Sequence, residues 1–284
     1  MGQCLAVPAE REAKALAKVH QGRAVARHFR AIKRLGVGSY GSVYLVERLS
    51  DGKRYALKET LLTELVQPLR WVAVNEVRIL ASLDPHPHVV SCMEGFLDGD
   101  YLCIVMEYMP GGELADIIQR YGEKDMLLPE ADVWSYFIQA ALGLKYLHVH
   151  CILHRDLKPQ NILMCEEGKL KIADLGVAHV VHGPKGSTKV QIGTPHYMAP
   201  EVWRREPYSF PADIWALGCI LHELCSLKPL FLADSEQAIE SRVIAGVVPP
   251  ISRRYSQELR DLIARMLQEE EVHVILLMEK REPR

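Results

Sequence analysis

The sequence predicts an α+β fold with two lobes, a small strand-rich N-lobe over residues 29–108 and a larger helical C-lobe over residues 112–267. Three observations support this prediction. Short β-branched runs dominate the first part, a linker rich in proline and glycine follows at Met109-Pro110-Gly111-Gly112, and helical patterns dominate the remainder. A chain of 284 residues is also long enough to bury one large or two modest cores.

The composition is that of an ordinary soluble globular protein, with 49% hydrophobic and 25% charged residues. A formal net charge of −2 gives no overall attraction to nucleic acid, so we expect no nucleic-acid partner. No apolar run approaches the roughly 20 residues that a membrane-spanning helix needs. The seven cysteines form no C-x-x-C pair, and four of them sit in apolar runs. This pattern favours a cytoplasmic location.

Residues 1–28 form a basic N-terminal extension. Residues 8–30 are rich in Ala, Lys and Arg, which favours helix. One interpretation is a solvated helical extension packed loosely on the protein. The other starts from Met1-Gly2-Gln3-Cys4, where myristoylated Gly2 and palmitoylated Cys4 would give peripheral membrane association. Ala6 departs from the Ser or Thr that this acylation pattern favours.

A glycine loop, Gly36-Val37-Gly38-Ser39-Tyr40-Gly41, lies between strand-like runs at residues 32–35 and 43–46. Glycines let backbone amides approach phosphate groups closely, because no Cβ intervenes. A dinucleotide-binding site would need a helix after the loop, whereas Val43 begins a second strand. The loop is therefore predicted to be a hairpin that covers a nucleotide.

A third strand ends in Lys58, and an amphipathic helix over residues 66–83 carries Glu76. A lysine that ends an apolar strand is often only an exposed edge residue. Two further strands are predicted at residues 89–96 and 101–108.

The C-lobe is predicted from its apolar stripes and turn residues. We expect a helix over 129–150, a strand over 170–173, a buried helix from residue 208, and helices over 236–245 and 256–267. Of the histidines near the end of the first helix, His154 is expected to pack inward. A zinc site is not expected, since no matching Cys or acidic cluster accompanies them.

The most informative stretch is His154-Arg155-Asp156-Leu157-Lys158-Pro159-Gln160-Asn161. It sets a carboxylate, an ammonium and a carboxamide within six residues, which fits phosphoryl transfer to a hydroxyl. Asp156 can accept the hydroxyl proton, Lys158 can neutralise charge on the transferred group, and Asn161 can hold Mg²⁺. The alternative is a solvated turn after a helix.

Asp174-Leu175-Gly176 follows eighteen residues after Asp156 and can supply a second Mg²⁺ ligand. Residues 177–192 are rich in Gly, Lys and His and are predicted to form a mobile loop. The loop leads into Gly193-Thr194-Pro195 and an Ala-Pro-Glu sequence that ends at Glu201.

Together these motifs resemble those of the eukaryotic protein kinases. The segments 193–201, 213–219 and 223–225 are most similar to the NIMA-related kinase (NEK) family. The resemblance implies the bilobal protein-kinase fold, ATP and Mg²⁺ as cofactors, and protein substrates. Lys158-Pro159 and Gly193-Thr194-Pro195 imply transfer to serine or threonine. The resemblance further implies association with the cytoskeleton or cilium.

The resemblance also implies a role for each site residue. Lys58 would bind the α- and β-phosphates and pair with Glu76, while Thr194 would bridge Asp156 and Lys158. Asn161 and Asp174 are the expected metal ligands. The other expected nucleotide-binding residues include Met106, behind the adenine pocket, and Glu107 and Met109, whose backbone would bind adenine. The full set is Gly36, Val37, Gly38, Ser39, Gly41, Val43, Ala56, Met106, Glu107, Met109 and Leu163.

Two features depart from the family pattern. Val190 replaces a hydroxyl residue that these kinases use for regulation, so regulation is expected to use Ser187, Thr188 or Thr194. Residues 268–284 form an atypical tail without the family's Arg-containing turn. The C-lobe is therefore expected to be truncated at its C-terminal end, with Glu201 unpartnered and stability reduced.

Two other functions remain open. A truncated or pseudokinase-like isoform would bind nucleotide and act as a scaffold. An adaptor would be recruited to a membrane by its basic N-terminus. Because all six catalytic and ligand positions are filled, the active kinase is the leading hypothesis. These positions are Lys58, Glu76, Asp156, Lys158, Asn161 and Asp174.

Overall fold

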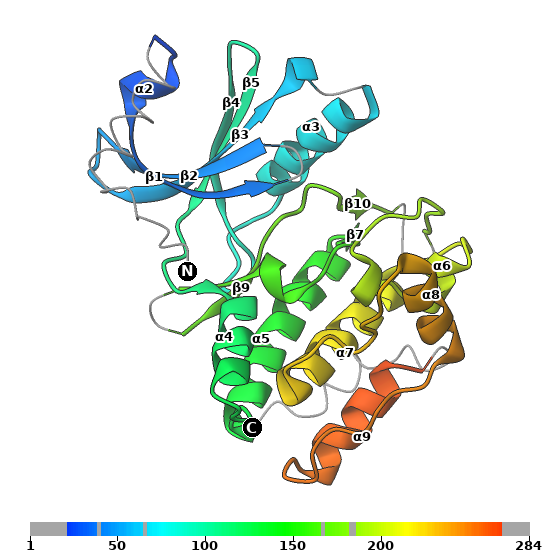
Figure 1. Ribbon diagram of the computed structural model, residues 1–284. Helices are drawn as coiled ribbons and strands as arrows, with labels where there is room; N and C mark the ends of the chain where they lie inside the picture. Colours follow the sequence, from blue (N-terminus) through cyan, green and yellow to red (C-terminus); the bar gives the residue numbers. More distant parts are fainter. Residues whose placement is uncertain (1–21, 39–40, 65–66, 166–167, 182–185, 269–284) are drawn as a thin grey trace. The chain divides into compact units, whose positions relative to one another are not determined.

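The computed structural model describes residues 22–38, 41–64, 67–165, 168–181 and 186–268. The chain divides into two compact units. The N-terminal unit comprises Met1–Pro85 and Val90–Met109, and the C-terminal unit comprises His86–Val89 and Pro110–Arg284. The first carries a sheet and the second is mostly helical, so the predicted α+β class with two lobes is confirmed (Figure 1).

The N-terminal unit is built on a five-stranded antiparallel sheet in the order β1-β2-β3-β5-β4. Helix α3 (Gln67–Ser82), which was predicted over residues 66–83, packs against β4 and β5. A 3₁₀ turn, η1 (Leu62–Glu64), follows β3. The strands are β1 (Phe29–Gly38), β2 (Gly41–Arg48), β3 (Arg54–Leu61), β4 (Cys92–Asp98) and β5 (Tyr101–Glu107).

One predicted strand begins later than expected. The apolar run from residue 89 suggested a strand over 89–96, but β4 starts at Cys92. Val89 instead forms a parallel bridge with Ile172 in the C-terminal unit, and it is 4% exposed. Its apolar side chain is therefore buried in the C-terminal unit, whereas β4 belongs to the N-terminal unit.

The residues just before the sheet belong to its core. Helix α2 (Val25–His28) is one turn long, and Val25 and Phe29 pack with side chains from one face of the sheet. A predicted helix that continues to residue 30 is therefore wrong, because Phe29 already begins β1. Loose packing of the extension is also wrong for these residues. The other members of this core are Tyr44, Val46, Tyr55, Leu57, Cys103 and Val105.

Two acidic residues fix the entry to α2. The Asp98 carboxylate accepts the Ala24 and Val25 amides at 2.9 and 3.0 Å. The Arg23 guanidinium pairs with Glu59 at 2.8 Å and with Asp98 at 3.2 Å, and it lies 3.9 Å over the Tyr101 ring. The backbone amides at the start of α2 thus find their acceptor, Asp98, more than 70 positions away in the sequence.

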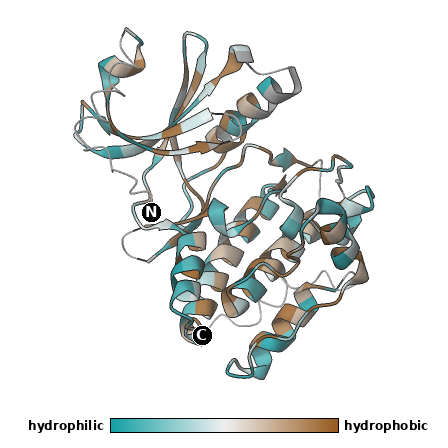
Figure 2. Cartoon of the chain, viewed as in Figure 1, coloured by the Kyte–Doolittle hydropathy of each residue, from teal (hydrophilic) through white to brown (hydrophobic). Residues whose placement is uncertain are grey.

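The C-terminal unit is organised around the buried helix α7. Helix α5 packs on one side of α7, and α9 packs against it as well (Figure 1). The predicted helices in this unit are confirmed, with ends that differ by a residue or two. Figure 2 shows apolar stretches interleaved with polar ones along them, as amphipathic packing requires. The helices are α4 (Leu114–Glu123), α5 (Glu130–Val149), α6 (Pro200–Trp203), α7 (Phe210–Ser226), α8 (Glu236–Ala245) and α9 (Gln257–Met266).

Short strands position the loops of this unit. β6 (Gly112–Glu113), β8 (Ile162–Met164) and β9 (Leu170–Ile172) form one sheet in the order β6-β8-β9. β7 (Ile152–Leu153) pairs with β10 (His179–Val180). Residues 154–161 therefore leave β7 and return to β8 through the 3₁₀ turn η2 (Pro159–Asn161).

Part of the predicted mobile loop is held by backbone pairing. β10 lies inside it, and Thr188 forms an antiparallel bridge with Tyr208. A second 3₁₀ turn, η3 (Pro195–Tyr197), follows Thr194.

Across the described parts of the chain, no helix combines the length and apolar character of a membrane span. The acylation sequence at Met1–Cys4, the glycine-loop residue Ser39 and the tail from residue 269 onward lie outside the described residues.

Candidate active site

The N-terminal unit holds a buried ion pair at Lys58. The Lys58 Nζ lies 2.8 Å from both carboxylate oxygens of Glu76. Glu76 is 3% exposed and is carried by α3, which packs against the sheet. The expected pair is present, and it fixes the direction in which the ammonium group points. A bidentate contact of this kind positions the cation more firmly than a single hydrogen bond does.

The strand register places other predicted nucleotide-binding side chains on the same face of this sheet as Lys58. Val43 lies directly opposite Lys58, and Ala56 lies directly opposite Met106. Residues directly opposite each other in antiparallel strands project from the same face, as do residues two apart along one strand. The four side chains therefore share the face opposite the core that contains Leu57.

The glycine loop is described only in part. Gly36, Val37 and Gly38 end β1, and Gly38 pairs with Gly41 at the start of β2. A Cβ at Gly41 would lie only 2.0 Å from the Glu59 carbonyl oxygen, whereas a Cβ at Gly36 would meet nothing within 4 Å. Gly41 is therefore required by the approach of β2 to β3.

The end of β5 is fixed by reciprocal contacts. The Glu107 amide donates to the Ser91 carbonyl at 3.1 Å, and the Glu107 carboxylate accepts the Ser91 amide at 2.6 Å. Met109 is buried at the end of this unit. These contacts define the course of the backbone through Glu107, one of the segments predicted to bind adenine.

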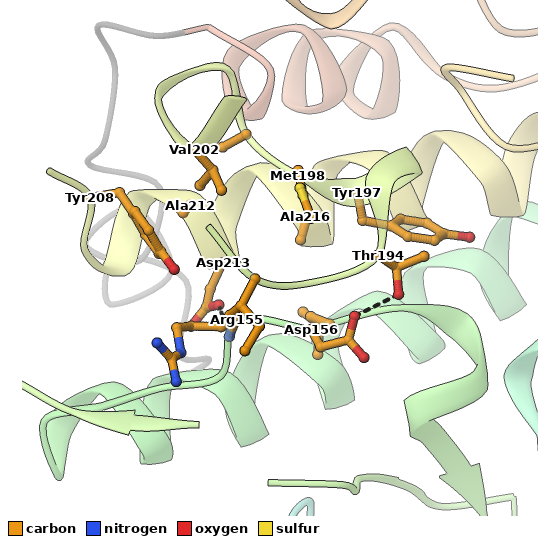
Figure 3. Close-up of a pocket in the computed structure, with 13 residues that line it drawn as sticks. Arg155, Asp156, Thr194, Tyr197, Met198, Val202, Tyr208, Ala212, Asp213 and Ala216 are labelled. Atoms are coloured by element: carbon orange, nitrogen blue, oxygen red, sulfur yellow. Dashed lines mark hydrogen bonds between the residues drawn. The ribbon is translucent and has the colours of Figure 1, made fainter. Parts of the chain in front are cut away.

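In the C-terminal unit, Asp156, Lys158 and Thr194 form a triangle. The Thr194 hydroxyl donates to Asp156 Oδ1 at 2.6 Å (Figure 3). The Lys158 ammonium donates to Asp156 Oδ2 at 2.7 Å and to Thr194 Oγ1 at 3.0 Å. The contact between Thr194 and both residues is the one that the family resemblance implied. It joins the loop after β7 to the segment that precedes α6.

Asn161 and Asp174 are brought to one end of the β8–β9 ribbon, where Ile162 pairs with Ile172. The Asn161 side-chain amide donates to the Asp156 carbonyl at 2.8 Å, and the Ala173 amide donates to the Asn161 carbonyl at 2.8 Å. Asp174 adopts a left-handed backbone with φ of 60°. Carboxylate and amide oxygens are hard donors that suit Mg²⁺.

The described residues contain no group of three or more His, Cys, Asp or Glu that could hold a metal ion. Mg²⁺ does not require such a group, since it usually keeps several waters and binds one or two carboxylates together with substrate phosphates. The donor set of Asn161 and Asp174 therefore fits Mg²⁺ bound together with a nucleotide.

Asp213 anchors the loop that carries Asp156. It lies in the first turn of α7, is 1% exposed, and accepts the His154 amide at 2.8 Å and the Arg155 amide at 2.9 Å. His148 Nε2 donates to it at 2.8 Å. Burial alone raises the pKa of Asp213, but the hydrogen bond and charge of His148 together with the backbone amides hold it below its ordinary value.

His154 completes this anchor from within the loop. It is fully buried, its Nε2 donates to the Ala173 carbonyl at 3.1 Å, and its Nδ1 accepts the Asp156 amide at 3.3 Å. The expectation that His154 packs inward is therefore confirmed. The ring connects the residue before Asp174 to Asp156 itself.

Sequence reasoning missed a buried contact behind Thr194. The Tyr197 hydroxyl donates to Glu223 Oε2 at 2.7 Å, and Glu223 is 6% exposed within α7. Burial raises the pKa of Glu223 to about 7, partly offset by the Tyr197 hydrogen bond. The only sequence signal was a carboxylate within a largely apolar helix, because a buried carboxylate needs a partner.

Leu163 lies on β8, where it is paired with Glu113 on one side and Lys171 on the other. It is half-buried, and its strand begins directly after Asn161.

Two expectations about the rest of this unit need revision. Glu201 was predicted to lack a partner, but it does take part in an interaction, so that prediction is wrong. Thr188 was a candidate phosphorylation site, but it is 8% exposed and its hydroxyl accepts the Val190 amide. Ser187 beside it is exposed and is the more accessible hydroxyl.

Comparison with known proteins gives a consistent result. Residues 29–273 match the family model for the protein kinase domain. The chain is 42% identical over 236 residues to the serine/threonine-protein kinase Nek4 of Mus musculus, covering 82% of this chain and 29% of that relative. It is 37% identical over 235 residues to Nek1 of Mus musculus, covering 83% of this chain and 19% of that relative.

A third relative, the serine/threonine-protein kinase Nek2 of Homo sapiens, is 36% identical over 255 residues, covering 87% of this chain and 57% of that relative. The chain thus spans from about a fifth to rather more than half of the length of these curated relatives. All three are NIMA-related kinases, the group to which the sequence motifs pointed. Because the family model covers most of the chain, this protein belongs to the protein kinase family.

Proposed function

We propose that this protein is an ATP- and Mg²⁺-dependent kinase that phosphorylates serine or threonine hydroxyls on protein substrates. The observation that carries the proposal is the triangle of Asp156, Lys158 and Thr194. A carboxylate and an ammonium lie side by side, and a hydroxyl from a separate segment holds both. This arrangement supplies an acceptor for the substrate proton next to a cation for the transferred group.

In the proposed reaction, the substrate hydroxyl oxygen forms a bond to the γ-phosphorus while the bond from that phosphorus to the β–γ bridging oxygen breaks. ATP supplies the phosphoryl group, and Mg²⁺ held by Asn161 and Asp174 would offset the charge of the leaving diphosphate. Asp156 orients the hydroxyl and accepts its proton, and Lys158 offsets the negative charge of the transferred group. Thr194 holds the side chains of Asp156 and Lys158 in position through its hydroxyl.

The remaining residues position the nucleotide and metal. Lys58, fixed by Glu76, would bind the α- and β-phosphates, and the side-chain oxygens of Asn161 and Asp174 would hold Mg²⁺. The glycine loop, together with Val43, Ala56, Met106, Leu163 and the backbone near Glu107 and Met109, would bind the rest of the nucleotide. No observation favours the pseudokinase alternative, because each expected residue is present.

A cytoplasmic location stays a prediction that rests on the cysteine pattern, and association with the cytoskeleton or cilium stays one that rests on the family resemblance. Membrane anchoring through Gly2 and Cys4 concerns residues outside the described part of the chain, and no observation supports it.

The test is a transfer assay with purified protein, Mg-ATP and a generic basic protein, in which Asp156→Asn is compared with wild type. We expect kcat to fall by about 10² to 10⁴-fold, because the proton acceptor is lost, while nucleotide affinity is kept. The matched control is Asp234→Asn, which alters an exposed carboxylate in the loop before α8. A kcat within about threefold of wild type for Asp156→Asn would contradict the assignment.

A further inference from the structure

Tyr208, just before α7, connects two segments that the proposed reaction uses. Its backbone forms an antiparallel bridge with Thr188, with hydrogen bonds of 3.0 and 2.9 Å. The next residue adds a third link, because the Ser209 hydroxyl donates to the Gly186 carbonyl at 2.8 Å. Residues 186–190 are therefore attached to the two residues before α7 by three hydrogen bonds.

The Tyr208 side chain adds the link to the catalytic loop. Its hydroxyl donates to the Val190 carbonyl at 2.6 Å, and the Arg155 side chain lines the same cavity. Arg155 Nε donates to the Val177 carbonyl at 2.6 Å. Figure 3 shows the Tyr208 hydroxyl pointing toward this guanidinium. A single phenol thus joins the segment at Val190 to the residue directly before Asp156.

Tyr208 is shielded from water, and Arg155 is half-buried. Tyr208 is 4% exposed, and burial lowers the pKa of Arg155 and raises that of Tyr208. The Arg155 guanidinium donates to the Val177 carbonyl and is also attracted by the Asp213 carboxylate.

The space around this contact is nearly filled. The cavity that Arg155 and Tyr208 line, together with Thr194, Met198 and Asp213, has a volume of about 20 Å³ (Figure 3). That volume is close to the room that one water molecule needs, and it is too small for a phosphate group. The position beside Arg155 that an anion could otherwise occupy already holds the tyrosine hydroxyl.

We propose that Tyr208 is a positioning residue that holds residues 186–190 against Arg155, and hence orients the catalytic loop, without a phosphate on that segment. The inference rests on the proposed kinase activity. Val190, which has no hydroxyl to modify, is consistent with it, because Tyr208 binds the backbone carbonyl at that position. The unphosphorylated protein is then the active form.

The experiment uses the full chain treated with a protein phosphatase, and compares wild type with Tyr208→Phe. Phe keeps the buried ring and removes only the hydroxyl. We expect kcat to fall about tenfold, since the hydrogen bond that holds Val190 beside Arg155 is lost, with the KM for ATP within about twofold of wild type. Amide hydrogen exchange should become faster in peptides that cover residues 186–192, and the melting temperature should change little.

Tyr136→Phe is the matched control, because it removes a tyrosine hydroxyl from α5, beside Asp132 and Tyr121 rather than in the cavity. It should leave kcat and local exchange unchanged. Ser209→Ala gives a second, milder test, since it removes the bond to Gly186 without touching Arg155. It should raise exchange in the same peptides and keep most of kcat.

Three results would overturn the proposal. Phosphatase treatment could abolish wild-type activity, Tyr208→Phe could keep wild-type kcat and exchange, or exchange could rise equally throughout the C-terminal unit, which would indicate a general loss of packing. If wild type transfers no phosphate before or after treatment, the proposed function fails instead. The exchange measurement would still test the Tyr208 link in that case.

Discussion

The two units hold their charged groups in different ways. In the N-terminal unit, Lys58 pairs with Glu76 on the face of the sheet opposite the core that contains Leu57. In the C-terminal unit, Asp156 is held by hydrogen bonds with Lys158, Thr194 and His154. The backbone of the loop around it is anchored by hydrogen bonds to Asp213.

The difference indicates how function and stability are coupled. The contact between Lys58 and Glu76 lies on the opposite face from the core around Leu57, so we expect its loss to remove activity and leave that core intact. Asp213 is itself part of the core, at the first turn of a buried helix, so a change there should affect both. Mutations ranked by expected size can test this contrast.

The largest effect is expected for Lys58→Met. Loss of phosphate positioning should lower kcat/KM by about 10³-fold or more, while the denaturant midpoint stays near that of wild type. Glu76→Gln should give a smaller loss, because Lys58 remains but is no longer fixed. Transfer assays and urea titration measure the two quantities.

The control for this pair is Lys53→Met, which removes an exposed lysine from the turn between β2 and β3. Its activity should match that of wild type. A large fall in unfolding free energy for Lys58→Met would mean that the N-terminal unit also couples function to stability, and the contrast would be wrong.

Asp213→Asn is expected to be next in size, at about 3–5 kcal/mol of unfolding free energy, since an amide leaves the His148 interaction and one backbone amide unpaired in a buried place. The depressed pKa gives the sign of the pH dependence. The carboxylate stabilises the fold above its unfolded pKa of 3.8, and this contribution is lost as pH falls through the lower folded value. The difference between wild type and Asp213→Asn, measured by urea denaturation, should therefore shrink at strongly acidic pH.

Glu223→Gln tests the same unit at a carboxylate whose pKa is shifted the other way. Because the folded pKa is about 7 and the ordinary value is 4.5, the folded state binds the proton more tightly than the unfolded state. Wild-type stability should therefore fall as pH rises from about 4.5 to 7, by up to about 3 kcal/mol.

Gln keeps an acceptor for the Tyr197 hydroxyl and cannot ionise. Glu223→Gln should thus flatten this part of the stability curve and be more stable than wild type above neutral pH. Glu240→Gln, a less buried carboxylate on α8, is the control. An identical pH profile for wild type and Glu223→Gln would show that Glu223 does not titrate in this range.

The smallest expected effect distinguishes two glycines of the N-terminal unit. Gly41→Ala places a Cβ against the Glu59 carbonyl and should cost about 1–3 kcal/mol of unfolding free energy. Gly36→Ala meets open space and should change stability by no more than about 0.5 kcal/mol. Equal costs at the two positions would mean that strand approach does not explain Gly41.

Local patterns predicted most elements because each depends on neighbouring residues. The alternation around Val43 and the apolar stripe of α5 each bury a face, and the predicted element follows from that face alone. The exception is instructive. Val89 is apolar and lies just before β4, yet it pairs with Ile172 of β9. No local sequence pattern distinguishes a residue of β4 from a residue that pairs with β9.

The candidate site was predictable where its residues are adjacent in sequence or belong to a long motif, as for Asp156, Lys158 and Asn161. Contacts between distant polar residues were not. Tyr208 and Arg155 are far apart in the chain, and Tyr197 and Glu223 are 26 positions apart within segments that resemble ordinary apolar packing. Burial, which decides that such groups must pair, is a property of the folded state.

The Asp98 contacts bear on where this catalytic domain physically begins. Family similarity starts at Phe29, but a polypeptide cut there would lose Arg23 and the amides of Ala24 and Val25. The Asp98 carboxylate, 7% exposed, would then keep none of these partners, and the pocket vacated by Val25 would open the core beside Phe29. For anyone who expresses this domain, the N-terminal boundary should include Arg23 rather than follow the edge of sequence similarity.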